Sequence, residues 1–111
     1  MKNIVRSFSL CLILIANVSI ATSVYKTSTV RHFGTYGNGF FVSLKDVTTA
    51  CGNDRYFMDI DANGSGAKVV IAGIISAFHA NTEVTINGTG QCHHAWTGDE
   101  VINTNNVHFS K

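Results

Sequence analysis

Two cysteines constrain this chain of 111 residues more than any other feature: Cys51 and Cys92, which stand 41 residues apart. Both follow an N-terminal segment that is typical of export, and an exported chain with an even pair of cysteines is expected to form a disulfide. In the chain-entropy model, closing a loop of that length stabilises the fold by about 4 kcal/mol. Free thiols or metal ligands are the alternative interpretation of the pair.

The first 21 residues have the three parts of a secretory signal peptide. Lys2 and Arg6 give a positive start, residues 8–16 are an apolar run, and residues 19–21 supply the small side chains that a signal peptidase recognises. We expect cleavage after residue 21, with a shift to Ser23 left open. The apolar run is shorter than the roughly 20 residues that a membrane span needs. An N-terminal anchor that is not removed is the alternative.

Residues 22–111 are expected to form one small domain with a limited core. Without Lys2 and Arg6, 6 basic residues face 7 acidic ones, so the net charge is −1 with histidine neutral. No basic cluster is present, and we therefore expect no nucleic-acid partner, because neutralising phosphates needs several clustered cations. We expect a secreted or periplasmic protein with no stable membrane anchor after cleavage, and no cofactor.

Alternating apolar and polar residues, with Val, Thr, Tyr and Phe enriched, predict β-strands. Turn residues rich in Gly and Asn separate them at 34–39, 61–66 and 87–90. The expected strands are 24–33, 40–47, 55–60, 83–87 and 100–109.

Residues 67–81 change to the spacings of three and four that predict a helix. Ser65 is the expected N-cap and Asn81 the expected stop. The β-branched residues leave a strand as the alternative. The predicted buried stripe is Val70, Ile71, Ile74, Ile75 and Phe78. The predicted opposite side is Lys68, Ala72, Ser76 and His79.

The first part of a calcium-loop pattern is present at Asp59, Asp61, Asn63 and Gly64. The twelfth position, which should supply a bidentate Glu, is Val70. We therefore interpret the segment as a polar turn that caps the helix.

A transition-metal site would combine Cys92, His93 and His94 with a distant histidine such as His32, His79 or His108. Neighbouring histidines on an extended segment point to opposite faces, so they seldom share a metal. No nucleophile motif surrounds any Ser or Cys, and we expect no catalytic residue. The two glycosylation-type triplets at 63–65 and 87–89 are interpreted as turns.

A binding surface is the favoured interpretation of Tyr36, His93, His94 and Trp96, which lie in predicted loops. Tyr and Trp present rigid apolar faces with a polar tip, which suits sugar stacking or a protein interface. The alternative for Trp96 is that it plugs one end of a small core.

The order of elements resembles that of the B subunits of bacterial AB5 toxins, of the subtilase cytotoxin and typhoid toxin types. The resemblance is carried by Cys51, the Asn63-Gly64-Ser65-Gly66 turn, the helix through Phe78, the strand at 84–86, and Cys92. It implies a five-stranded OB-fold barrel, a ring pentamer, recognition of host glycans and a separate catalytic subunit.

The sequence therefore predicts a mainly β (α+β) domain: a small five-stranded OB-fold-like barrel with one disulfide and one helix covering one end. We expect a non-catalytic exported binding module for a glycan or protein partner, with a homo-pentamer implied by the resemblance. The alternative function is a periplasmic or secreted accessory protein, or an enzyme inhibitor. A small hydrolase is a third, weaker hypothesis.

Overall fold

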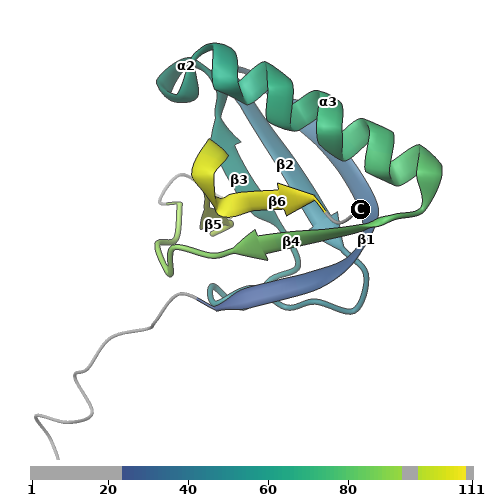
Figure 1. Ribbon diagram of the computed structural model, residues 1–111. Helices are drawn as coiled ribbons and strands as arrows, with labels where there is room; N and C mark the ends of the chain where they lie inside the picture. Colours follow the sequence, from purple (N-terminus) through teal and green to yellow (C-terminus); the bar gives the residue numbers. More distant parts are fainter. Residues whose placement is uncertain (1–23, 94–97, 110–111) are drawn as a thin grey trace, which may run out of the picture.

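The computed structural model describes residues 24–93 and 98–109, so the expected signal peptide lies outside the described residues. Six strands, one main helix, one helical turn and one 3-10 turn follow one another along the chain (Figure 1). Their bounds are β1 Tyr25–Tyr36, β2 Gly39–Leu44, β3 Tyr56–Asp59, α2 Ile60–Asn63, α3 Ser65–Ala80, β4 Glu83–Asn87, β5 Glu100–Val101, η1 Thr104–Asn106 and β6 Val107–Phe109.

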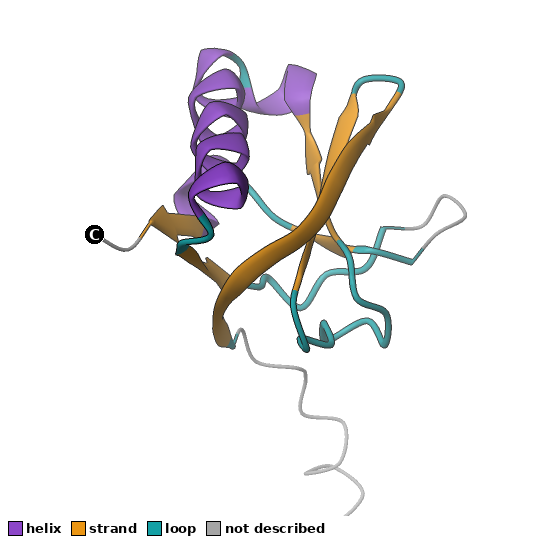
Figure 2. Cartoon of the chain, turned by 90° about the vertical axis from the view of Figure 1, so that its right-hand side faces the viewer, coloured by secondary structure: helices purple, strands orange, loops and turns teal. Residues whose placement is uncertain are grey.

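The strands form one curled, mixed sheet in the order β5-β3-β2-β1-β4-β6. The long β1 belongs to both halves of the sheet, because residues 25–29 pair with β4 and residues 30–36 pair with β2. The register shifts between Val30 and His32, where an irregularity of this kind bends a strand. This bend allows the sheet to curl into a half-barrel around its core, as Figure 2 shows from the side.

The prediction of a single last strand at 100–109 is wrong, and this is why the sheet has six strands rather than five. The segment divides into β5, which pairs in parallel with β3, and β6, which pairs antiparallel with β4. Between them, the side-chain oxygen of Asn106 accepts a hydrogen bond from the Asn103 N–H at 2.8 Å and closes η1. The two halves of this segment thus occupy the two opposite edges of the sheet.

Helix α3 covers one end of the curled sheet (Figures 1 and 2). Its buried residues are Ala67, Val70, Ile74 and Ala77, with Ile71 packed against the core. From the predicted stripe, Phe78 is 40% exposed, although its ring contacts that of Phe33 edge-on at 5.4 Å. The predicted exposed side is confirmed at Lys68, Ala72, Ser76 and His79.

The prediction is wrong for the N-cap of α3 and correct for its C-terminal end. Ser65 is the first helical residue and not the N-cap, because Gly64, with φ of 60°, takes that position. Asn81 ends the helix as predicted, in the left-handed conformation that suits Asn after a helix. Among the described residues, no helix is long and apolar enough to cross a membrane.

Candidate functional site

The outer face of β1, β2 and β3 carries a row of aromatic side chains. In β2, Phe40, Val42 and Leu44 enter the core, so the alternation of a strand places Phe41 and Ser43 on the opposite face, where Phe41 is half-buried and Ser43 is fully buried. Phe57 of β3 lies opposite Phe41 in the register. The sequence analysis predicted a strand in this region but gave Phe41 no role.

Two glycines make room for this row. An added Cβ on Gly34 would meet the Phe41 ring at 2.5 Å, and one on Gly39 would collide with the Phe57 ring. Interpreting both glycines as turn residues is therefore wrong, because each lies in a strand beneath an aromatic ring. The turn itself is only Gly37 and Asn38, with Gly37 at a φ of 53°.

Five rings lie close together here and are called the aromatic surface: His32, Tyr36, Phe41, Phe57 and His93. Ring centroids are 5.1 Å apart for Tyr36 and Phe41, and 6.0 Å for Tyr36 and Phe57. His93 lies 4.5 Å from Phe57, and His32 lies edge-on to Phe41 at 5.7 Å. These separations are those of interacting aromatic pairs. Four of the rings come from β1, β2 and β3, and His93 comes from the segment after Cys92. Phe57 is buried at 9% exposure, whereas the other four rings are exposed or half-buried.

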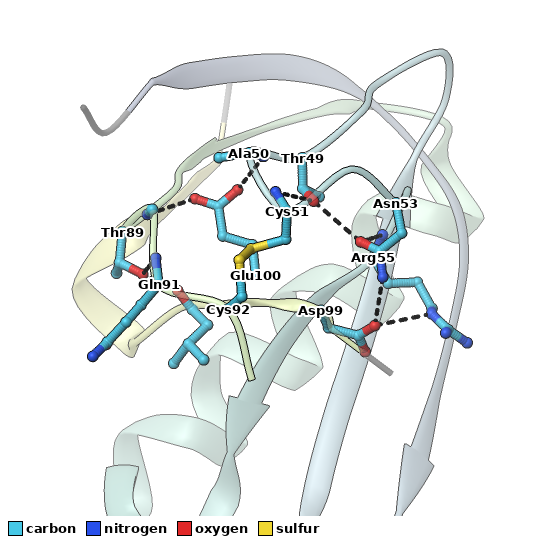
Figure 3. Close-up of a disulfide and its surroundings, with 12 residues drawn as sticks. Thr49, Ala50, Cys51, Asn53, Arg55, Thr89, Gln91, Cys92, Asp99 and Glu100 are labelled. Carbon is cyan, nitrogen blue, oxygen red and sulfur yellow. Dashed lines mark hydrogen bonds and ion pairs between the residues drawn. A yellow bond between two sulfur atoms is a disulfide. The ribbon is translucent and has the colours of Figure 1, made fainter. Parts of the chain in front are cut away.

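A buried carboxylate supports the aromatic surface from beneath. Asp99 is fully buried, and it accepts hydrogen bonds from the Tyr36 hydroxyl and the Asn53 side-chain amide, each at 2.8 Å. Its charge is balanced by Arg55, whose Nε lies 3.3 Å from Asp99 Oδ1 (Figure 3). The Arg55 guanidinium also lies 5.7 Å from the centre of the Phe41 ring. Asp99 therefore fixes the polar tip of Tyr36 and holds a cation at the edge of the rings.

The disulfide holds His93 in place. Cys51 and Cys92 are bonded, which confirms the predicted pair (Figure 3). Beyond Cys92, the His93 N–H donates to the Asp99 carbonyl at 2.8 Å, and the Val101 N–H donates to the Gln91 carbonyl at 2.7 Å. These bonds join residues 91–93 and 99–101 as the two sides of a hairpin. The disulfide thus joins the loop of Cys51 to this hairpin, and the hairpin in turn pairs with β3 through β5.

Of the four predicted binding residues, the structure brings Tyr36 and His93 together, on either side of Phe57. His94 and Trp96 lie outside the described residues, in the segment 94–97 that follows His93. Sequence reasoning missed Phe41, Phe57 and Asp99. Phe41 and Phe57 could have been found from strand alternation, whereas no motif marked Asp99.

The remaining predictions concern calcium and transition-metal sites. Asp59 caps α2 by accepting the Ala62 N–H at 3.1 Å, so the calcium-like segment forms a helical turn. Cys92 is in the disulfide and is no thiolate ligand. Within residues 24–93 and 98–109, no three His, Cys, Asp or Glu side chains are grouped so as to hold a metal ion.

Comparisons of the chain with protein-family models, curated proteins and solved structures gave no match. The resemblance to toxin B subunits therefore rests on the residues quoted for it above. Any function must be argued from the geometry of the site, because a fold does not imply a function.

Proposed function

We propose that this protein is a non-catalytic, exported binding module that recognises a glycan through the aromatic surface. The observation that carries the proposal is the set of five contacting rings, four on the outer face of three strands and His93 beside them. Sugar rings have apolar faces of C–H groups that stack on aromatic side chains, while their hydroxyls need nearby donors and acceptors. Arg55 at the rim and the histidine nitrogens supply those polar partners.

The rigidity of the surface supports the same proposal. Binding by pre-positioned rings costs little side-chain entropy, because the rings are already ordered before the ligand arrives. Here Gly34 and Gly39 admit the rings, and Asp99 fixes Tyr36. The disulfide further favours an oxidising compartment, in support of a periplasmic or extracellular location.

We further propose that the half-barrel is a variant of the OB-fold in which the last strand is divided. The supporting observations are that β1 pairs with both β2 and β4, and that β5 is parallel to β3 while β6 continues antiparallel to β4. One helix between β3 and β4 covers an end of the sheet, as expected for that fold.

A homo-oligomer, with a pentamer as the first expectation, is part of the same proposal. Val69 on the outer side of α3 is 72% exposed, and Lys68 and His79 are the only titratable side chains along that helix. Val69 and Phe78 are exposed large apolar side chains of this helix, and association with another copy would cover them. Sedimentation of the mature protein as a pentamer would support this, and a monomer would contradict it.

A glycan array tests the binding function. Wild-type protein is expected to bind one class of glycan, and Tyr36→Ala and Trp96→Ala are each expected to abolish binding by removing a stacking ring. Tyr25→Ala is the matched control: Tyr25 is on the same strand and 64% exposed, but in the half of β1 that pairs with β4.

Absence of glycan binding by the wild-type protein, or binding that both substitutions leave unchanged, would contradict the proposal. Recovery of one specific enzyme in a pull-down from periplasmic extract would then favour the alternative of an accessory or inhibitor protein.

A further inference from the structure

A second concave site lies on the other side of β5 from the aromatic surface. It is a cavity of about 200 Å³ between the start of β1, the segment that carries Thr48 and Thr49, and the inner sides of β3 and β5. Neighbouring residues of an extended segment point to opposite faces. Asp99 therefore bonds Tyr36 of the aromatic surface, whereas Glu100 lines the cavity. Figure 3 shows the two carboxylates turned to opposite sides, Asp99 toward Arg55 and Glu100 toward Ala50.

Glu100 is a buried carboxylate without a cation. It is 2% exposed and accepts hydrogen bonds from the backbone N–H groups of Ala50 and Gly90, each at 2.8 Å. Among the described residues, no Lys, Arg or His nitrogen forms an ion pair with it, whereas its neighbour Asp99 has Arg55. A buried charge is normally paired, because desolvation is costly. The cavity beside Glu100 has space for the cationic group of a ligand.

Tyr56 adds a second polar residue to the same cavity. The side chain is 1% exposed and lines the cavity. Burial, and then the charge of Glu100, raise the pKa of Tyr56 from 10.0 to about 12. The hydroxyl therefore keeps its proton at ordinary pH and is able both to donate and to accept a hydrogen bond.

The cavity also presents a positive group. Lys26 of β1 lines it, so one small space is lined by a glutamate, a lysine and a tyrosine. Its volume is below the roughly 300–1,000 Å³ of pockets for drug-sized ligands. The space thus suits one compact ligand that carries both charges.

We propose that this cavity binds a small zwitterion of the α-amino acid class, with its ammonium group at Glu100 and its carboxylate at Lys26. The Tyr56 hydroxyl completes the contacts as a neutral hydrogen-bonding group. This site is separate from the aromatic surface and does not depend on glycan recognition there.

Calorimetric titration of the mature, oxidised protein with each of the twenty common amino acids tests the proposal. At least one should bind saturably. For the best of them, the amide (which lacks the carboxylate charge) and the hydroxy acid (which lacks the ammonium) should each bind at least about tenfold more weakly, because each loses one charge-assisted contact.

Lys26→Met should weaken the amino acid about tenfold and leave its amide unaffected. Lys45→Met is the control, since Lys45 is an exposed lysine outside this cavity. Glu100→Gln should abolish binding, and if that variant does not fold, the Lys26 variant and the two analogues still decide the question. No binding by any amino acid, equal binding of the amide, or binding unchanged in Lys26→Met would each overturn the proposal.

Discussion

At the end of the half-barrel covered by α3, the buried side chains are apolar: Val70 and Ile74 of the helix pack with Val84, Ile86 and other core residues. At the end that carries the disulfide, the buried side chains include Asp99 and Glu100, each held by hydrogen bonds. The helix end is stabilised by packing, whereas the disulfide end depends on a covalent bond and satisfied carboxylates. Both proposed binding sites use the carboxylates of the second end: Asp99 bonds Tyr36 of the aromatic surface, and Glu100 lines the cavity.

The largest expected effect is at the disulfide end. Replacing both cysteines, as Cys51→Ser with Cys92→Ser, should lower the free energy of unfolding by about 4 kcal/mol, because the unfolded chain regains the freedom of a 41-residue loop. Urea unfolding monitored by circular dichroism measures it. A loss below about 1 kcal/mol would show that polar contacts alone hold this end.

The helix end should respond to a cavity instead. Ile74→Ala should lower the free energy of unfolding by about 3 kcal/mol, because Ile74 is fully buried and its methyl groups leave a void. Glycan binding at 25 °C should be unchanged in the folded fraction, since the core cluster that contains Ile74 includes none of the five rings of the aromatic surface. A loss of binding by the folded variant would contradict the separation of the two ends.

Alkaline pH should weaken the disulfide end through Tyr56. The unfolded chain releases the Tyr56 proton near pH 10, but the folded protein keeps it up to about pH 12, because its pKa is raised. The corresponding stability is fully present below pH 10 and is lost as the pH rises toward 12, by about 2.5 kcal/mol.

Urea unfolding across that pH range, compared between wild type and Tyr56→Phe, isolates this contribution because the other tyrosines and lysines are common to both proteins. The wild type should lose more stability than the variant. Parallel curves for the two proteins would mean that Tyr56 is not responsible.

The smallest effect concerns the bond between Tyr36 and Asp99. Tyr36→Phe should lower the free energy of unfolding by about 1.5 kcal/mol, the lower end of the range for a hydrogen bond to a charged group. Because the ring remains, glycan binding should persist, in contrast to Tyr36→Ala. Tyr25→Phe, at an exposed tyrosine, serves as the control and should leave stability within about 0.5 kcal/mol of wild type.

The sequence predicted the local elements well and the long-range ones less well. The spacing in residues 67–81 predicted α3, and alternation predicted β2, β3 and β4, because these patterns reflect burial on one face. The division of the last strand was missed, since it depends on the side chain of Asn106 and on two different partner strands.

The candidate site was predicted only in part, because it too depends on contacts between residues far apart in the sequence. Tyr36 and His93 stood out by residue type, but their meeting at Phe57 depends on the hairpin turn and the disulfide together. Gly34 and Gly39 looked like turn residues because a sequence does not show which aromatic ring will lie over a glycine.

The most direct test of the central claim is NMR chemical-shift mapping of the mature, oxidised protein with the glycan that binds best on the array. The largest shifts should fall on Phe41, Phe57 and His93, with the α3 residues Ala67 to Ala77 unchanged. Shifts concentrated on α3, or an absence of shifts at the three aromatic residues, would contradict the assignment of ligand binding to the aromatic surface.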